Sequence, residues 1–497
     1  MPLAVTREEA TIALNFLHEL GPLARSRSHL PITTTSVTGK RTAWIALTRF
    51  LCNPYWNRAW IMQEIARGRR VSILYGGYHI DWMQLRSFFE IFDHEEVLRA
   101  VIMEITRYEL RLDQIKYTAI GQVRALSALR DRVSRSDLPG IVEAMKTTTR
   151  SEATDPRDKV YALYSLIARD QRIVPDYSLS AEDVYVEIAQ AFQNTKPASM
   201  LEFAGIGYER KFKDLPSWAP DWTMLPTKRH EQELYATGSS RYHAGGSIVL
   251  LSVQLVHELG PRLHLVAAPI SQLRLLSDPF RLTNLFDSLA TQGSSIHAKD
   301  LQYWILNAII MLVDNMPRIY PRTGQFIREA IWRTLIGDCG QADQQVSGTS
   351  LMHPAPYAPY ARLYDIYVDE VVPLYMALVA GGNMARAADI AMEDLGVDAF
   401  MQKFTEFVLA VASACTARRV AITDDKTIAL VPELAEDGDW LCVVPGLAFP
   451  VILRKVPENG NSSEELWQFV GDSYAHGLMA AEAIDVLELP RREFTLI

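Results

Sequence analysis

Short runs of β-branched and apolar residues near the end of the chain most constrain how it can fold. From Arg418 onward these runs are RRVAIT, TIALV, WLCVV, FPVILRKV and ELWQFVG, separated by Asp-Asp, Asp-Gly and Asn-Gly turns. Two similar runs lie between residues 247 and 275 and are split by a Gly-Pro turn. Because two strands alone do not bury the face of a sheet, we expect residues 236–275 and 416–497 to form one small, discontinuous β-domain. Residues 276–415 would then be a helical insertion.

The first part of the chain, residues 1–235, is mainly helical in its apolar spacing, with one strand. Asn53 and Pro54 predict the N-cap and first turn of a helix that runs through WNRAWIMQEIARG. The run RVSILY, ending at Gly76-Gly77, predicts a buried strand directly after it. Asp155-Pro156 and Ser180 predict two further capped helices. The fold class is therefore expected to be mixed α+β.

Composition limits the kinds of protein this chain can be. Hydrophobic residues are 48% and charged residues 22% of the 497, which is typical of a globular chain. The net charge of −9 argues against a nucleic-acid partner. Four widely separated cysteines indicate neither a zinc site nor a disulfide framework, so we expect a reducing, cytoplasmic setting. No apolar stretch reaches the roughly 20 residues that a membrane span needs.

Five segments carry a resemblance to a known family. They are NPYWNRAWIMQEIARGRRVSILYGG, RSEATDPRDKVYALYSL, VPDYSLSAEDVYVEIA, LPSWAPDW and the C-terminal RRVAITDDKTIALVPELAEDGDWLCVVPGLAFPVILRKV with FVGDSYAHGLMAAEA. In this order they resemble the fungal heterokaryon incompatibility (HET) domain proteins, over about residues 42–232 and 416–497. The family's usual Ser-Tyr-x-Trp-Gly start and Cys-Ile-Asn-Gln motif do not occur. We therefore expect an N-terminally shortened HET module, with its last third from Trp56 onward.

The resemblance implies both a fold and a role. It implies a partial α/β HET region, distantly similar to TIR domains, followed by a helical block and a small β-domain. It also implies a regulatory or interaction protein with a protein partner, acting in fungal non-self recognition and the programmed cell death that follows. Two alternatives stay open: a TIR-like NAD hydrolase, and a diverged HET-like protein that serves a biosynthetic pathway.

Glu64 is the first candidate for chemistry. Trp56, Trp60 and Glu64 lie at spacings of four residues, so we expect them to share one helix face, where the two indoles partly desolvate the carboxylate. The spacing of Trp60 and Glu64 resembles the TIR motif whose glutamate serves NAD cleavage. That resemblance implies a carboxylate stabilising the positive charge that develops on ribose as nicotinamide leaves. NAD is then the expected substrate, and no other cofactor or metal is indicated.

A structural alternative accounts for the same residues. Glu64 would pair with Arg67, Arg58 or Arg157, and the indoles would be core residues. The same choice applies to the remaining candidates for binding: Arg58, Arg157, Asp158, Asp221 and Trp222. Asp155 and Asp158 would otherwise cap a helix beside Arg157, whereas the acid–aromatic pairs Asp176-Tyr177 and Asp221-Trp222 would fix turns.

The C-terminal motif contains a last group, Tyr474, His476 and Glu482. A histidine near a carboxylate is typical of a general base. No G-x-S-x-G nucleophile motif, H-E-x-x-H zinc motif or glycine-rich phosphate loop accompanies it. We therefore expect His476 to be structural.

Overall fold

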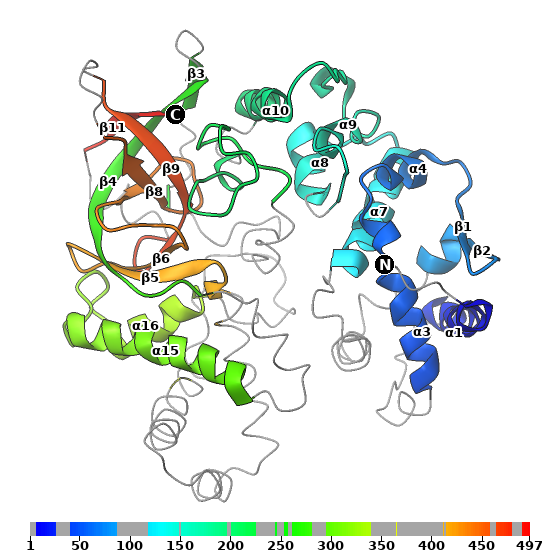
Figure 1. Cartoon of the computed structure of the whole chain (residues 1–497), viewed down its shortest axis with the longest axis horizontal. Helices are drawn as coiled ribbons and strands as arrows, with labels where there is room; N and C mark the ends of the chain where they lie inside the picture. Colours follow the sequence, from blue (N-terminus) through cyan, green and yellow to red (C-terminus); the bar gives the residue numbers. More distant parts are fainter. Residues whose placement is uncertain are drawn as a thin grey trace, which may run out of the picture. The chain divides into compact units, whose positions relative to one another are not determined.

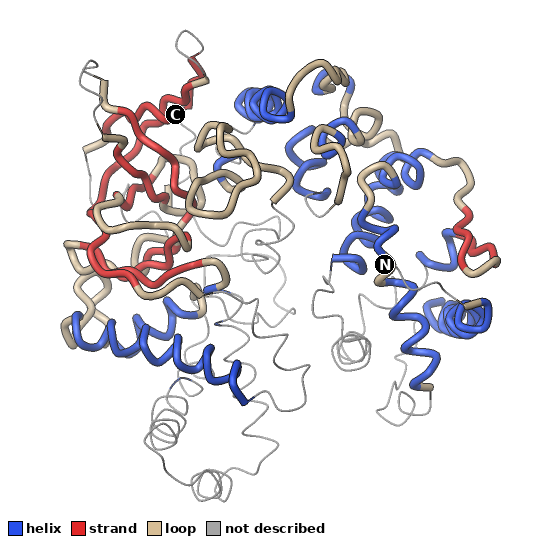
Figure 2. The backbone as a smooth tube through the Cα atoms, in the orientation of Figure 1, coloured by secondary structure: helices blue, strands red, loops and turns tan. Residues whose placement is uncertain are grey.

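A computed structural model describes residues 6–25, 40–86, 118–148, 151–195, 200–224, 244–245, 253–256, 261–280, 295–338, 364, 411, 414–457, 464–479 and 490–497. The chain divides into two compact units. One consists of Met1–Ala191 with Phe286–Ser294, and the other of Phe192–Leu285 with Ser295–Ile497. Helices and strands are both present (Figures 1 and 2), so the mixed α+β class is confirmed. The domain boundaries expected from the sequence and the similarity to TIR domains stay predictions.

The first unit is mostly helical in the residues described. Its elements are α1 (Arg7–Arg25), α3 (Arg41–Leu51), η1 (Pro54–Asn57), α4 (Ile61–Arg67), β1 (Ser72–Tyr75), β2 (Tyr78–Asp81), α7 (Thr118–Ser134), α8 (Ile141–Thr148), α9 (Asp158–Tyr161), η2 (Arg169–Gln171) and α10 (Ala181–Thr195).

Aromatic rings packed edge to face form much of the core around α3. Phe16 of α1 meets Trp44 of α3 with ring centroids 4.7 Å apart. Phe50 contacts Trp56 at 5.6 Å on one side and Tyr75 of β1 at 4.7 Å on the other. Such edge-to-face pairs add to the free energy gained by burying the rings. They fix η1 and β1 against the end of α3.

The helix α4 is held against the segment that follows Asp155. Arg67 donates to the Ser165 carbonyl at 2.9 Å, and the Ser165 hydroxyl donates to Gln63 at 2.9 Å. Arg130 of α7 donates to the carbonyl of Gly68, the C-cap residue of α4, at 2.6 Å, which satisfies a carbonyl at the end of this helix. The segment that follows Asn53 and the segment that follows Asp155 therefore pack together.

Three local predictions have different outcomes. The Ser180 cap is confirmed, since Asp183 N donates to the Ser180 hydroxyl at 3.0 Å and the Asp183 carboxylate accepts from Ser180. The helix after Asp155 is shorter than expected, and α9 has only four residues. The strand RVSILY was expected to be buried, which is wrong: Ser72 is exposed and Leu74 is 67% exposed, because β1 belongs to a sheet of only two strands.

The second unit is built on one nine-stranded sheet. Its strands are β3 (Val253–Val256), β4 (Arg262–Leu276), β5 (Arg418–Thr423), β6 (Ile428–Pro432), β7 (Trp440–Val443), β8 (Val451–Lys455), β9 (Leu466–Asp472), β10 (Tyr474–Ala475) and β11 (Arg492–Leu496). Helices α15 (Ser295–Asn315) and α16 (Ile327–Leu335) accompany it, and much of the expected helical insertion lies outside the described residues.

Strand β4 closes part of this sheet into a ring. Its residues 263–267 pair with β11, residues 268–272 pair with β7, and residues 273–276 pair with β5. Because β7, β8, β9 and β11 are paired in succession, the order β4-β7-β8-β9-β11 returns to β4. A closed ring removes the exposed edges that an open sheet would present. Small and branched apolar side chains fill the core beside it, among them Leu273, Val443, Ile452 and Val470.

A buried ion pair fastens the end of β9. Arg418 and Asp472, each 2% exposed in its side chain, are bonded to one another, and the Tyr208 hydroxyl donates to Asp472 at 2.8 Å. The segment around Tyr208 is hydrogen-bonded to β9, since Ile206 N donates to the Phe469 carbonyl at 3.0 Å. Glycine is needed at position 205, where φ is +124° and a Cβ would meet the Val470 carbonyl.

Candidate functional site

The chain after Asn53 does not form the continuous helix expected. Asn53 caps η1 through a 2.9 Å bond from Tyr55 N, but Arg58 is extended and bridges to Glu152. Ala59 N then donates to the Glu152 carbonyl at 2.8 Å, and α4 starts only at Ile61. This pairing with a distant segment interrupts the helical hydrogen bonds. The prediction that Trp56, Trp60 and Glu64 share one helix face is therefore wrong.

The two indoles consequently have different environments. Trp56 is 1% exposed and donates from Nε1 to the Phe50 carbonyl at 2.9 Å, so it is a core residue. Trp60 is 38% exposed, and its Nε1 donates to the Asp158 carboxylate at 2.9 Å.

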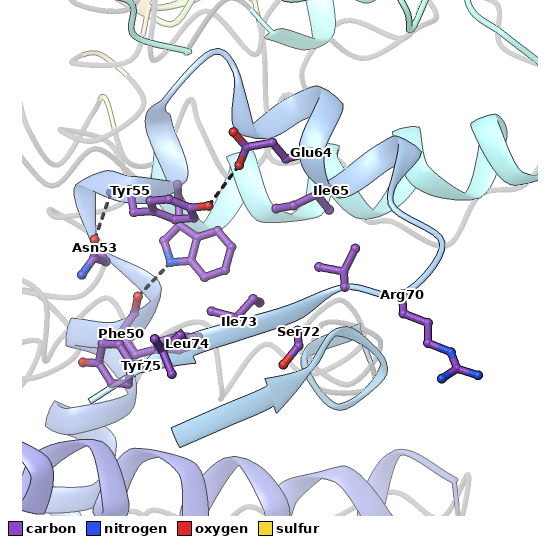
Figure 3. A pocket seen from close by; sticks show the side chains of 12 residues that line it. Phe50, Asn53, Tyr55, Glu64, Ile65, Arg70, Ser72, Ile73, Leu74 and Tyr75 are labelled. Atoms are coloured by element: carbon purple, nitrogen blue, oxygen red, sulfur yellow. Dashed lines mark hydrogen bonds between the residues drawn. The ribbon is translucent and has the colours of Figure 1, made fainter. Parts of the chain in front are cut away.

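Glu64 lies on the exposed side of α4 and lines a cavity of about 480 Å³. We call this cavity the β1 groove, and it is lined by Phe50, Asn53, Tyr55, Trp56, Glu64, Ile65, Arg70, Val71, Ser72, Ile73, Leu74 and Tyr75. Figure 3 shows Glu64 and Ile65 on one side of the groove, and Ser72, Ile73 and Leu74 of β1 on the other. Aromatic walls with a few polar groups are typical of ligand sites.

Among the described residues, Tyr55 is hydrogen-bonded to the Glu64 side chain. Its hydroxyl donates to the carboxylate at 3.3 Å (Figure 3), and its ring lies 5.8 Å from the Arg58 guanidinium. Partial burial, followed by the negative charge of Glu64, raises the pKa of Tyr55. The phenol therefore stays protonated near neutral pH and holds one carboxylate oxygen in place. None of the arginines expected to pair with Glu64 does so among the described residues.

Arg157 and Asp158 belong to a neighbouring cluster that does not line the groove. The Tyr177 hydroxyl donates to Asp158 at 2.7 Å, on the oxygen that Trp60 does not use. Arg157 pairs with Asp155 at 2.7 Å, donates to the Tyr177 and Leu179 carbonyls and lies 5.1 Å from the Tyr177 ring. The pKa of Asp155 is lowered, chiefly by its bonds from the Arg157 side chain. The exposed aromatic rings of Trp60 and Tyr177 are thus fixed through one carboxylate.

Asp221 and Trp222 belong to the second unit, whereas the other predicted site residues belong to the first. The buried Asp221 carboxylate accepts from Lys211 N at 2.8 Å and from Thr223 N at 3.0 Å. Trp222 is buried and packs against Phe203. These contacts support the structural interpretation of both residues.

Tyr474 and His476 are bonded to each other in the second unit, whereas Glu482 lies outside the described residues. Among the described residues there is no cluster of three or more His, Cys, Asp or Glu side chains that could hold a metal ion. None of the helices described is long and apolar enough to cross a membrane.

Two features of the site were not predicted from the sequence: the contribution of Tyr55 and the long side of the groove that β1 forms. Tyr55 follows the Asn53-Pro54 cap directly, so its place beside a helix start was a usable signal. The groove itself depends on how β1 and α4 are arranged in space, and neither segment shows this alone.

The family-model match lies within the second unit, whereas the match to a known protein covers most of the chain. Residues 312–497 match the family model of the Het-6 beta-barrel domain. Over 389 residues the chain is 23% identical to heterokaryon incompatibility protein 6, OR allele, of Neurospora crassa. The match covers 72% of this chain and 53% of that protein, so the chain spans about half the length of this relative. No solved structure matches the chain.

Proposed function

Since this chain is a relative of the fungal heterokaryon incompatibility proteins and carries a Het-6 beta-barrel domain, we propose that it acts in fungal non-self recognition. Its role would be that of a regulatory or interaction protein in the cell death that follows, in the cytoplasm. The match over 72% of the chain to a heterokaryon incompatibility protein is the observation that carries this proposal. The exposed aromatic residues near Glu64 support an interaction surface, because Trp, Tyr and Arg dominate the energetics of protein interfaces.

Expression in a fungal host tests this proposal. Inducing the full chain should arrest growth, whereas a variant with Trp60→Ala and Tyr177→Ala should arrest it less, because the exposed rings are lost. Growth and dye exclusion would be scored at matched protein levels. Phe326→Ala, which removes an exposed ring from the second unit, serves as the control. Unchanged growth on expression of the native chain would contradict the proposal.

A second candidate function is NAD hydrolysis, and the position of Glu64 in the β1 groove favours it. Water would replace nicotinamide at the anomeric carbon: the C–N bond breaks, a C–O bond forms and one proton is released. Glu64 would stabilise the cationic ribose in the transition state, while Tyr55 fixes the carboxylate at 3.3 Å. Trp60 and Arg157 would not take part, since neither lines the groove.

Nicotinamide release from NAD, followed by chromatography, tests this second function. Glu64→Gln should lower the rate by about 100-fold or more, because the developing positive charge loses its counter-charge. Glu143→Gln on α8 is a matched control, since this exposed carboxylate pairs with Arg132 and does not line the groove. Equal rates for Glu64→Gln and the native chain, or no release by the native chain, would remove this candidate.

A further inference from the structure

Among the residues that the structure describes, one edge of the β1–β2 hairpin presents backbone groups with which no other strand pairs. Strand β1 pairs with Ser72 opposite Asp81 and Leu74 opposite His79, and Trp82 N donates to the Val71 carbonyl at 3.2 Å. In an antiparallel pair, hydrogen-bonded and non-hydrogen-bonded positions alternate. The positions of Ser72 and Leu74 are therefore the non-hydrogen-bonded ones, so their N–H and C=O groups point away from β2. Within the part of the chain that the structure describes, no other strand pairs with β1.

The β1 groove runs along this free edge. Six consecutive residues, 70 to 75, line it. Successive side chains of a strand point to opposite faces, so a cavity over one face would be lined by every second residue. Lining by every residue in turn is what a cavity along the edge produces. The opposite wall comes from Tyr55 of η1 and from Glu64 and Ile65 of α4 (Figure 3), and Trp56 also lines the groove.

We propose that the β1 groove binds an extended segment of a partner protein, which adds to β1 as a third strand. Its backbone would pair with the free N–H and C=O groups of Ser72 and Leu74, the mode of recognition known as β-augmentation. About four residues at roughly 3.3 Å each would cover the edge. This inference rests on the proposed interaction role and names the chemistry by which the partner is recognised.

The lining of the groove sets the composition of that segment. Apolar side chains at alternate positions would face Ile73, which is partly exposed, whereas Trp56 and Ile65 line the groove but are almost fully buried. Glu64 and Arg70 are the charged residues of the lining, and both are exposed. Figure 3 shows Arg70 at the far end of the strand from the Tyr55–Glu64 pair. The partner segment would therefore carry a basic residue at the Glu64 end and an acidic residue at the Arg70 end.

A single strand fits better than the hairpin of a second copy of this chain. The groove is bounded opposite β1 by η1 and α4. A second copy would have to bring both β1 and β2 toward the edge, and this wall stands where the second strand would lie.

Peptide binding to the purified full chain tests the proposal. The probe is a fluorescein-labelled library of seven-residue peptides with alternating Val and Thr, a Lys at one end and a Glu at the other. Binding is followed by fluorescence anisotropy. The best binder is then remade in two forms, with N-methyl groups on one or the other set of alternate amides. The form methylated on the amides that face β1 should bind at least ten-fold more weakly, whereas the other form should bind like the parent.

Two protein variants test the same edge from the other side. Ser72→Pro removes an N–H that the β1–β2 ladder does not use, so proline is tolerated there. Binding should weaken about three- to ten-fold, as for the loss of one backbone hydrogen bond. His79→Pro removes the matching N–H from the opposite edge of the hairpin and should leave binding unchanged. Glu64→Lys alone should abolish the preference between the peptide and its charge-reversed form, whereas Glu64→Lys combined with Arg70→Glu should reverse it.

Several outcomes would overturn the proposal. The first is that no library member binds, and the second is that the two methylated forms bind equally well. The third is that the native chain forms a dimer that Ser72→Pro dissociates, which would assign the edge to a second copy. Growth arrest without peptide binding would remove this inference and leave the proposed function. Peptide binding without growth arrest would remove the proposed function and leave this inference.

Discussion

At the scale of single residues, His476 shows how a candidate catalytic group becomes a structural one. Its Nδ1 lies 2.9 Å from the Tyr474 hydroxyl and its Nε2 lies 2.9 Å from the Gln325 amide oxygen. The Tyr320 hydroxyl donates to its carbonyl at 2.9 Å. A neutral ring protonated on Nε2 accepts from Tyr474 and donates to Gln325, so both nitrogens are used. Burial, followed by the positive charge of Arg333, lowers the pKa of His476 to about 4.

This shift predicts a loss of stability on mild acidification. The pKa of His476 is about 4 when folded and near 6.5 when unfolded. Between these values the unfolded chain binds more protons, so the free energy of unfolding decreases as the pH falls, by at most about 1.4 kcal/mol per pH unit. The midpoint of thermal unfolding, measured from pH 7.5 to 5, should fall less steeply in His476→Gln. His79→Gln, on the hairpin of the first unit, should keep the native slope. Parallel curves for the native chain and His476→Gln would contradict this assignment.

At the scale of secondary-structure elements, local signals were enough where an element depends on its own residues. The Ser180 cap and the strands β5 to β9 lie where their caps, turns and β-branched runs predict them. The break in the helix at Arg58 could not be predicted from local residues, because it is caused by backbone pairing with Glu152, which is distant in the sequence. The C-terminal strand β11 was also missed, since its short run REFTL has no turn signal comparable to those before it.

The candidate site was predictable only where it depends on local residues. The sequence singled out Glu64, and the structure places this carboxylate at a cavity. The face it was expected to share with two indoles does not exist, because the break turns Trp56 into the core and leaves Trp60 on the surface. The free edge of β1 follows from the pairing of strands, which residue patterns do not fix when a strand is only four residues long.

At the scale of the whole molecule, the closed ring of strands extends beyond the region that matches the barrel family. That match begins at residue 312, whereas β4 ends at Leu276. Yet β4 pairs with β5, β7 and β11, and without it the ring β4-β7-β8-β9-β11 stays open. Tyr208, still earlier in the chain, supplies one of the bonds to the buried Asp472. The unit that contains this closed ring therefore includes residues at least as far back as 208.

A pair of fragments tests how far the folding unit extends. Residues 192–497 contain β4 and the Tyr208 segment, so this fragment should unfold in one cooperative transition with a strand-rich circular dichroism spectrum. Residues 312–497 alone should show no cooperative transition, because β7 and β11 would each lose their pairing with β4 and leave backbone groups and apolar faces in water. Adding a separate 253–280 peptide in excess should restore some structure to the short fragment, since the strand acts through pairing and not through chain connectivity. Cooperative unfolding of 312–497 at the same midpoint as 192–497 would show that β4 is dispensable, and the ring would then not be what stabilises this unit.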